Sequence, residues 1–514
     1  MPYRMKNLLL FMFIFWSLCL TAQNKQDYVW LFGLGINPST GEQTGYKFDF
    51  NEQPFEFEHQ DIPIPIASNN SSICDSEGNL LFFSNGCVIY NSEYELMENG
   101  DSLNYNEWIS IFWSDCINGY RGAQDVMIVP DLYNDAYYYI IHKPKIFNGF
   151  NEQDSIPIHY SMVDMNANNG LGKVIVKNKK LYEDGICLIN YLTGITHQNG
   201  SDYWFLQPLE SDSIIVTISI DEDGIHHSFN QNSHVYFDRD WSSSSGTAKL
   251  SPDGTKYALY NYYDQLHLYD FDRETGLLSN HQKINVFPNP SFSEIRFSSV
   301  EWSANSRFIY TASTLELHQI DTWESNIEQD GIRLIDIYDG TQDPFSTVFY
   351  LMAQAPDCKI YMCPTSGTRS YHVINNPNQL GTDCDFVQNG MRLPHSSHVG
   401  SMPNFPRFRV DEEEKCDPTI VSVFGDAVYY RRDLVVYPSP STGLFTIDLP
   451  EDFSSGRLVV TNLQAQILRD EPIDRLTFEG AVQLYDLPEG IYNIEIYPSD
   501  NVQRIFYSKQ VVKL

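Results

Sequence analysis

One pattern recurs along most of this chain and limits the folds open to it. A turn that contains Asp or Asn leads repeatedly into a short run of aliphatic and aromatic residues. These turns are marked by Asp75, Asp131, Asp202, Asp253, Asn305 and Asp357. Their successive spacings are 56, 71, 51, 52 and 52 residues. A period of about 50 residues made of several short strands is typical of a β-propeller, in which each blade is one four-stranded sheet.

The repeat belongs to a longer stretch, residues 28–406, with a β-type pattern. Short runs rich in Val, Ile, Tyr and Phe alternate there with Asp, Asn and Gly turns, and helical periodicity is almost absent. Dividing these 379 residues by about 52 per unit predicts about seven blades. We therefore expect an all-β protein with an about seven-bladed β-propeller at residues 23–410. Radial repetition adds core between blades, which suits a chain of 514 residues that is too long for one compact centre.

Residues 250–278 show how one unit forms. In the turn from Ser251 to Gly254, proline fixes φ, aspartate caps the turn and glycine takes a positive φ. Strands are expected at residues 257–262 and 266–271, because both runs are rich in aromatic and aliphatic residues. The segment resembles one blade of lactonase-like and YVTN-type propellers.

The charge balance limits the partners of this surface. Lys and Arg total 33 and Asp and Glu total 67, which gives a formal net charge of -34. Such a surface repels phosphate backbones and anionic lipid headgroups, so nucleic acid is not an expected partner. Aromatic residues make up 14% of the chain, far more than in a disordered acidic protein.

Residues 1–22 have the composition of a secretory signal peptide. Arg4 and Lys6 precede an apolar run at residues 8–20, and cleavage is expected at the Ala22–Gln23 bond. A membrane span needs about 20 apolar residues, so this run is too short for an anchor. No later run approaches that length, and we expect an exported mature protein without a transmembrane span.

Eight cysteines follow the expected cleavage site: Cys74, Cys87, Cys116, Cys187, Cys358, Cys363, Cys384 and Cys416. An even number of cysteines in an exported chain allows disulfides, but the sequence selects no pairing. Buried free thiols are the alternative. The absence of a C-x-x-C pair weakens a zinc or redox interpretation.

The chain changes character after Pro406. Residues 411–415 form a charge run, and we expect residues 411–433 to be an acidic linker. Five short β-type runs follow within residues 434–514, which predicts a small antiparallel, immunoglobulin-like β-sandwich.

This C-terminal region resembles the type A sorting domain of the type IX secretion system. The matching segments are YPSPSTGLFTIDL from Tyr437, LVVTNLQAQIL from Leu458, LYDLPEGIYNIEIY from Leu484 and SKQVVKL from Ser508. The motif residues are Tyr437, Pro438, Pro440, Gly443, Gly490, Tyr492, Lys509 and Lys513. Ser439 and Ala465 depart from the usual Asn and Gly. The resemblance implies that the type IX machinery carries the folded cargo across the outer membrane. Cleavage near the linker would then release the cargo or attach it to surface glycolipid.

The first region is similar to a family of secreted propellers from Bacteroidetes-type bacteria. The similarity lies in CDSEGNLLFFSNGCVIYN from Cys74, HQNGSDYW from His197, APDCKIY from Ala355 and SMPNFP from Ser401. Asn85 and Met402 are mild departures from the family pattern. The resemblance implies a secreted or outer-membrane cell-surface location and brings no settled chemistry with it.

Local catalytic motifs are absent, because the chain has no G-x-S-x-G, H-E-x-x-H or P-loop sequence. His395 and His398 would lie on opposite faces of a strand, and the pair His226–His227 is no better placed for a metal. His197 and Trp204 frame a candidate inner strand that would line the axial channel.

Calcium remains open as a cofactor, and no other cofactor is indicated. Hard cations prefer oxygen ligands, which Asp221, Glu222 and Asp223 or Asp270 and Asp272 would supply. Neither cluster matches an EF-hand loop, and solvated turns are the simpler interpretation.

Two functional hypotheses follow. The first is a non-catalytic surface or secreted interaction protein whose propeller top or channel binds a glycan, a peptide or a partner protein. The second is a hydrolase or lactonase-like enzyme with acidic side chains converging in the axial channel. The fold alone cannot separate them, and the lack of catalytic motifs favours the first.

Overall fold

The structure is a computed structural model of the chain, and almost all its regular structure is β-strand. It describes residues 24–36, 43–51, 55–66, 68–104, 119, 122–144, 156–210, 212–237, 245–287, 296–396, 400–410, 430–449, 453–462, 467–478, 480–498 and 505–514. The chain divides into two compact units, Met1–Glu414 and Lys415–Leu514. The expected signal peptide, its cleavage site at Ala22 and Gln23, and residues 411–429 of the expected linker lie outside the described residues.

The described part of the first unit forms seven antiparallel sheets, which follow one another along the chain. The first sheet has the order β3-β2-β1-β4 and contains β1 (Val29–Ile36), β2 (Gln43–Asp49), β3 (Glu56–His59) and β4 (Pro65–Ile66). The second contains β5 (Ser71–Cys74), β6 (Leu80–Ser84) and β7 (Ile89–Asn91). The third contains β8 (Val126–Pro130), β9 (Tyr137–His142), β10 (Ile158–Asp164) and β11 (Lys173–Tyr182).

In the fifth to seventh sheets, strands adjacent in sequence are adjacent in the sheet, whereas in the fourth both β12 and β13 pair with β14. The fourth contains β12 (Ile186–Cys187), β13 (Thr193–Thr196), β14 (Tyr203–Glu210), β15 (Ile214–Asp221) and β16 (Gly224–Asn232). The fifth contains β17 (Thr247–Leu250), β18 (Lys256–Asn261), β19 (Gln265–Asp272) and β20 (Leu277–Ile284). The sixth contains β21 (Ser298–Trp302), β22 (Phe308–Ser313), β23 (Glu316–Asp321) and β24 (Ile332–Ile337). The seventh contains β25 (Met352–Gln354), β26 (Ile360–Met362), β27 (Ser370–Ile374) and β28 (Phe386–Arg392). Short helical turns are η2 (Asn168–Gly170), η4 (Ile327–Gly331) and η5 (Gly381–Cys384).

The six repeated Asp or Asn turns lie in six different sheets. Five of them lie between the first and second strand of their sheet along the chain, and the turn at Asp202 lies between β13 and β14, the second and third strands of the fourth sheet. In those five turns the Asp or Asn side chain caps its own turn. A side-chain oxygen of Asp75, Asp131, Asp253, Asn305 or Asp357 accepts the N–H two residues later, at 2.9–3.2 Å. This local bond explains why Asp and Asn recur there.

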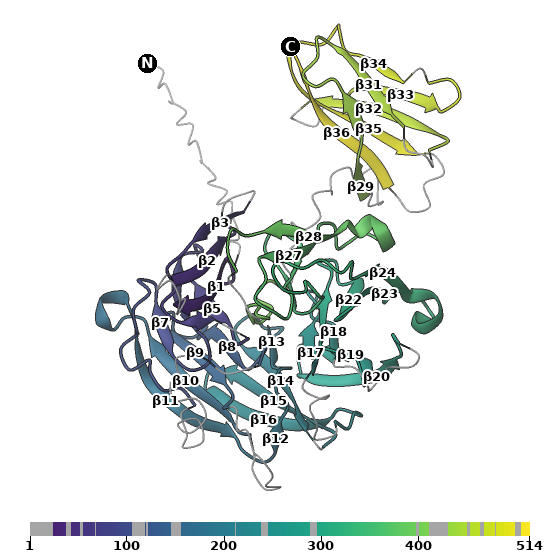
Figure 1. Ribbon diagram of the computed structural model, residues 1–514. Helices are drawn as coiled ribbons and strands as arrows, with labels where there is room; N and C mark the ends of the chain where they lie inside the picture. The colour runs from purple at the N-terminus through teal and green to yellow at the C-terminus, as the bar shows by residue number, and fades with distance from the viewer. Residues whose placement is uncertain are drawn as a thin grey trace, which may run out of the picture. The chain divides into compact units, whose positions relative to one another are not determined.

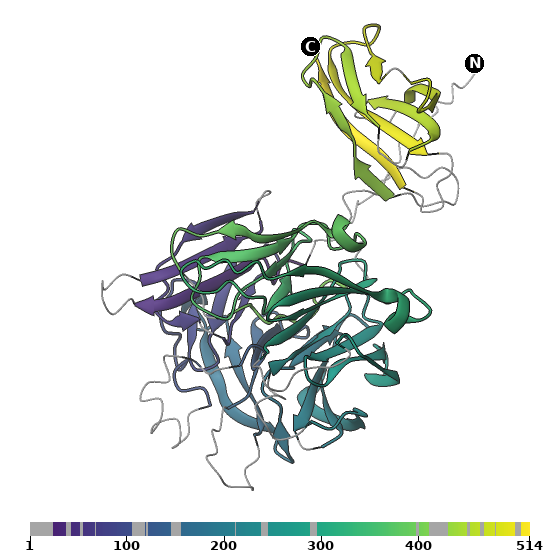
Figure 2. The ribbon, with the colours of Figure 1, turned by 45° about the vertical axis from the view of Figure 1, so that its right-hand side comes forward.

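The sheets form a closed ring (Figures 1 and 2), because the first sheet packs against the seventh. Phe32 on β1 and Phe48 on β2 contact Tyr371 on β27, with ring centroids 5.5 and 5.6 Å apart. Buried apolar clusters fill the other interfaces between neighbouring sheets. The core is therefore distributed between sheets, and the expected propeller fold is confirmed.

The second unit is a sandwich of two sheets that share one core. One sheet has the order β29-β36-β35-β32-β33 and the other β30-β31-β34. The strands are β29 (Tyr430–Asp433), β30 (Val435–Tyr437), β31 (Leu444–Asp448), β32 (Ser455–Asn462), β33 (Ile467–Asp474), β34 (Ala481–Gln483), β35 (Gly490–Pro498) and β36 (Ile505–Lys513). The core contains Phe445 and Val482 from one sheet and Val460 and Ile494 from the other. β29 pairs with β36 in parallel, so residues 430–433 are part of the first of these sheets.

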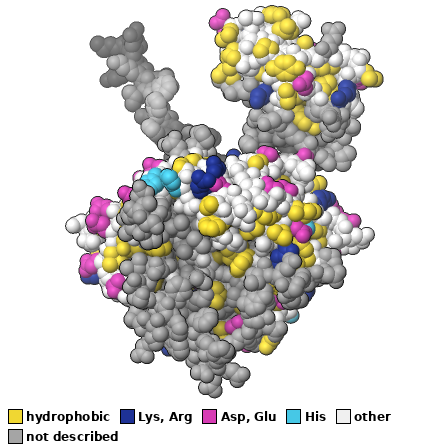
Figure 3. Space-filling view, viewed as in Figure 1, with side chains coloured by type: hydrophobic (Ala, Val, Ile, Leu, Met, Phe, Trp, Pro, Cys, Tyr) yellow, Lys and Arg dark blue, Asp and Glu magenta, His cyan; other side chains and the backbone are white. Residues whose placement is uncertain are grey.

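Acidic side chains are spread over the face of the first unit drawn in Figure 3, where Lys and Arg side chains are few. This distribution agrees with the formal net charge of -34. Among the described residues of this face, Lys and Arg side chains do not form a broad basic surface of the kind that binds nucleic acid.

Candidate functional site

The centre of the ring is lined by the inner strands of six of the seven sheets. These are β5, β8, β13, β17, β21 and β25, and several of them contact their neighbours in the ring directly. Residues 401–409 follow the seventh sheet in sequence and run among these strands. We call them the axial segment.

Asn404 joins the axial segment to three sheets. Its backbone N–H donates to the carbonyl of Asn70 at 2.8 Å. Its side-chain amide donates to the carbonyls of Val126 and Leu192, both at 3.2 Å. Asn404 is only 2% exposed, so these bonds replace water for carbonyls that would otherwise be unpaired.

Arg407 joins the axial segment to β13 and to the inner strands of the fifth, sixth and seventh sheets. Its N–H donates to the carbonyl of Gly194 at 2.8 Å, and its Nε donates to the carbonyl of Leu250 at 2.9 Å. Its two terminal nitrogens donate to Glu301 on β21 and to Gln354 on β25. Together, Asn404 and Arg407 bond to residues in or next to all six of the inner strands.

Glu301 is the buried anion of this centre. It is 1% exposed, and it faces Arg407 and, at 3.7 Å, the Nζ of Lys249. Burial favours the neutral carboxyl, but the charges of Arg407 and Lys249 outweigh it and lower the pKa of Glu301. Burial lowers the pKa of Lys249 despite the attraction of Glu301. Glu301 and Arg407 are therefore an ionised pair held in the middle of the ring.

The remaining space at this centre is small. A cavity of about 40 Å³ lies beside the axial segment, and its lining includes Asp27, Lys249, Glu301, Arg407 and Arg409. A space of that size holds very few water molecules. Its two carboxylates are each paired with an arginine, Glu301 with Arg407 and Asp27 with Arg409. Among the described residues that line this cavity, both carboxylates are therefore held in ion pairs.

The structure corrects the expected position of His197 and Trp204. Trp204 lies on β14, the second strand from the centre, and its indole N–H donates to the carbonyl of Arg273 at 2.9 Å. His197 lies in the preceding turn and bonds to the carbonyl of Glu274 at 2.9 Å. Both side chains therefore pack against the β19–β20 turn of the next sheet and do not line the axis.

Of the other histidines considered for a metal, the structure describes His226, His227 and His395. His226 contacts Asp221 at 3.4 Å, whereas His227 bonds to Asn230 at 2.9 Å. His395 is exposed and donates its backbone N–H to the hydroxyl of Tyr46. His398 lies outside the described residues.

The acidic clusters considered for calcium are engaged in turns and ion pairs. Asp221 accepts the N–H of Asp223, and Asp272 accepts the N–H of Glu274. Asp270 pairs with Lys256. Among the residues that the structure describes, no group of three or more His, Cys, Asp or Glu is arranged to hold a metal ion.

The cysteines divide into two kinds. Cys87 and Cys358 are disulfide-bonded, and the free, buried thiols are Cys74, Cys187, Cys363 and Cys384. Burial raises the pKa of all four thiols, to about 12 for Cys187 and about 11 for Cys384. A thiol that stays protonated is a poor nucleophile, so these four are structural. Cys116 and Cys416 lie outside the described residues.

In the second unit, the fold brings together motif residues that are distant in sequence. Gly490 on β35 is paired with Lys513 on β36, and Ser441 donates its N–H to the carbonyl of Val512. The ammonium of Lys513 donates to the carbonyl of Leu487. The segment from Pro438 to Gly443 therefore lies against the end of β36.

The tyrosines and the other lysine of the motif have different environments. Tyr492 is buried and donates to the carbonyl of Pro488 at 2.7 Å. Tyr437 is 48% exposed, and its hydroxyl bonds to Asp448 at 3.2 Å. Lys509 is exposed farther back on β36.

The two motif glycines provide a matched test of this packing. Gly443 has a φ of +117°, and a Cβ there would lie 3.0 Å from Tyr485 and 3.1 Å from Lys513. A Cβ on Gly490 would meet nothing closer than 3.8 Å. We expect Gly443→Ala to lower the free energy of unfolding of this unit by about 1–3 kcal/mol and Gly490→Ala to change it by less than about 0.5 kcal/mol. Denaturant titration of both variants checks this, and equal effects would contradict the packing described.

The comparisons with known proteins bear on the second unit. Residues 435–513 match the family model described as the secretion system C-terminal sorting domain. The chain carries a type IX sorting domain. This domain indicates export and a secreted or outer-membrane surface location, and it implies handling by the type IX secretion machinery. Among the described residues, no helix is both long and apolar enough to span a membrane.

A comparison with curated proteins finds no relative. Solved structures similar to the chain include a protein from Lactobacillus plantarum, at 11% identity and TM-score 0.42, covering 72% of this chain and 98% of that one. A functionally unknown protein from Desulfotomaculum acetoxidans has 13% identity and TM-score 0.36, with 73% and 99% covered. The Cps50 (Swd1) β-propeller domain of Myceliophteria thermophila has 10% identity and TM-score 0.30, with 74% and 95% covered. At these scores the fold assignment rests on the sheets described above.

Proposed function

We propose that this protein is a non-catalytic binding protein, displayed on or released from the cell surface, with the propeller as cargo and the C-terminal unit as sorting signal. The sorting-domain match at residues 435–513 supports the export route. The axial segment supports the non-catalytic role, because it occupies the place where a catalytic propeller would gather its acidic side chains. The partner would be a glycan or a surface protein that contacts the outside of the ring.

The alternative, a hydrolase or lactonase-like enzyme, requires carboxylates that converge in the axial channel. Glu301 and Asp27 are the carboxylates at the axial cavity, and both are paired with arginine. Turnover of a lactone or a glycoside by the full chain, lost in Glu301→Gln, would favour the enzyme and contradict our proposal.

Deleting residues 430–514 tests the sorting role. The deletion starts at β29 because that strand pairs within the second unit. In a bacterium with a type IX system, we expect the shortened protein to remain in the periplasm, whereas the full chain reaches the surface or the medium. Immunoblots of the cell fractions check this, with Lys180→Met, a change of an exposed side chain in the first unit, as the control. Normal export of the shortened protein would overturn the sorting role.

A further inference from the structure

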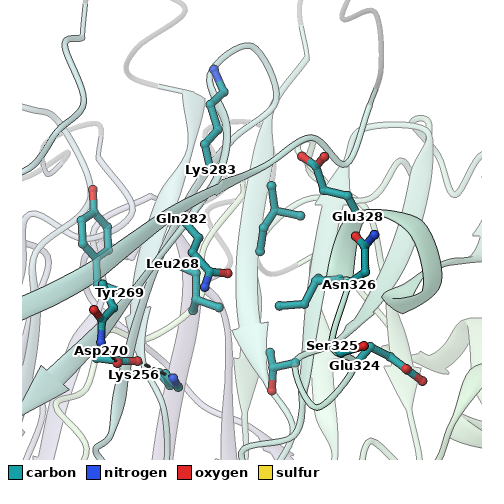
Figure 4. A pocket seen from close by; sticks show the side chains of 14 residues that line it. Lys256, Leu268, Tyr269, Asp270, Gln282, Lys283, Glu324, Ser325, Asn326 and Glu328 are labelled. Atoms are coloured by element: carbon teal, nitrogen blue, oxygen red, sulfur yellow. Dashed lines mark hydrogen bonds and ion pairs between the residues drawn. The ribbon is translucent and has the colours of Figure 1, made fainter.

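A cleft of about 460 Å³ opens between the fifth and sixth sheets, away from the axis (Figure 4). One wall is formed by Lys256 on β18, Leu268 and Asp270 on β19, and Gln282 on β20. These residues form cross-strand pairs, Lys256 with Asp270 and Leu268 with Gln282. The opposite wall is the segment 322–328, which follows β23. The volume is typical of a site for a small ligand.

The interface between these two sheets is apolar along one part of its length and polar along another, and the cleft lies at the polar part. One part of the interface is an apolar core that contains Tyr260, Leu266, Val300, Trp302 and Ile320. In the cleft, polar side chains such as Asn280 and Gln282 take the place of apolar ones. Polar groups that face each other across this space do not close it by hydrophobic packing, so a hydrated opening remains.

Several polar groups of the cleft are held in fixed positions. Asp270 is paired with Lys256 and also accepts a bond from the amide of Asn280 at 2.6 Å. On the other wall, Glu328 accepts two bonds from Asn285, at 2.7 and 2.8 Å. Groups that are already oriented lose little entropy when a ligand binds.

Other polar groups of the cleft are unused. Within the part of the chain that the structure describes, the side chains of Gln282, Lys283, Glu324 and Ser325 make no hydrogen bond or ion pair, yet all four line the cleft. The amide of Gln282 and the hydroxyl of Ser325 come from opposite walls, whereas the ammonium of Lys283 points away from the other lining side chains (Figure 4). The cleft thus presents donors and acceptors from both walls to whatever enters it.

We propose that this cleft binds a neutral oligosaccharide, which rests on the binding function proposed above. The lining contains three carboxylates, Asp270, Glu324 and Glu328, and two lysines, Lys256 and Lys283. Because negative charges outnumber positive ones, the lining gives no advantage to an anionic ligand. The polar lining does not suit a hydrocarbon. An uncharged molecule rich in hydroxyls can bond to the polar groups of both walls.

The test uses the full chain and defined probes. Calorimetric titration with cellohexaose, xylohexaose and mannohexaose should detect binding of at least one of them. Gln282→Ala should weaken that binding at least tenfold, and Ser325→Trp, which places a bulky ring at the cleft, should abolish it. Trp323→Ala is the matched control, because Trp323 is 64% exposed in the same segment but does not line the cleft. It should change the affinity less than twofold, and thermal unfolding should show that all variants fold.

Three results would overturn the proposal. Binding of no saccharide, or stronger binding of an oligogalacturonate or an uncharged hexapeptide, would exclude a neutral saccharide as the ligand. Saccharide binding that survives both cleft substitutions but is lost in Trp323→Ala would place the site on the exposed aromatic surface. In that last case the binding function would stand and only the cleft would be wrong, whereas turnover of a lactone or a glycoside that is lost in Glu301→Gln would contradict the proposed function itself.

Discussion

Replacing Arg407 with methionine is expected to lower the free energy of unfolding of the first unit by about 3–5 kcal/mol. The substitution removes the main positive charge from Glu301, which is 1% exposed. Lys249 alone remains near Glu301, at 3.7 Å. The carbonyl of Leu250 also loses its donor. Removing one member of a buried ion pair is costly because the other charge stays in a medium of low polarity.

Denaturant titration followed by tryptophan fluorescence measures this loss, since Trp30 and Trp302 are fully buried and change environment on unfolding. Lys180→Met is the control. It removes an ion pair to Glu183 whose side chains are 63% and 56% exposed, and such pairs contribute about 0–1 kcal/mol. Equal, small effects of the two substitutions would show that Arg407 does not hold the centre of the ring together.

Lowering the pH from about 6.5 to about 4 is expected to destabilise the first unit strongly, and His372 is one cause. This side chain on β27 is fully buried, and burial lowers its pKa to about 4. Its Nδ1 accepts the N–H of Asn389 at 3.1 Å and its Nε2 donates to the carbonyl of Thr347 at 2.8 Å. The imidazole is therefore neutral in the folded protein. Below pH 6.5 the unfolded chain binds a proton that the folded chain does not, so stability is complete above pH 6.5 and lost toward pH 4.

The substitution His372→Gln separates this residue from others that act in the same direction. Burial also lowers the pKa of His159 and His318 to about 4. We expect the variant to lose stability at pH 7 and to show a pH slope of the unfolding free energy that is shallower by about 1.4 kcal/mol per pH unit between pH 6 and 4.5.

Val373→Ala serves as the control, because it shortens a buried side chain at the next position but removes no titrating group. It should lower the unfolding free energy at every pH and keep the slope of the unaltered protein. An unchanged slope in His372→Gln would contradict the assignment of a neutral, buried His372.

The sequence predicted those parts of the fold that depend on local bonds. The turns at Asp75, Asp131, Asp253, Asn305 and Asp357 are recognisable because each side chain caps its own turn. The strands expected at residues 257–262 and 266–271 correspond to β18 and β19 within one residue at each end. The first sheet does not show the same turn, because its edge strand β4 comes after the other three and pairs with β1.

The site could not be predicted because its contacts join residues that are far apart in sequence. Arg407 and Glu301 are separated by 106 positions, and Asn404 and Val126 by 278. The sequence drew attention to SMPNFP at residues 401–406 only through a family resemblance, which does not say where that segment lies. The sequence offers one local indication of this segment: Pro403 and Pro406 flank Asn404, and two arginines, Arg407 and Arg409, follow in an otherwise acidic chain.

The sorting domain presents the opposite case. Its motif residues were assigned from resemblance, and their order along the chain was sufficient for that. Their convergence depends on the pairing of Gly490 with Lys513 at the end of β36, which no local pattern encodes. For this reason the different environments of Gly443 and Gly490 emerge only from the structure.

Hydrogen–deuterium exchange of the axial segment tests the central claim, that the chain itself fills the middle of its propeller. The N–H groups of Asn404 and Arg407 donate to the carbonyls of Asn70 and Gly194, both at 2.8 Å. We expect these two amides in the full chain at neutral pH to exchange as slowly as those of the core strands β8 and β17. Exchange at the rate of an unstructured peptide would contradict this claim, because it would mean that the centre of the ring is open to water.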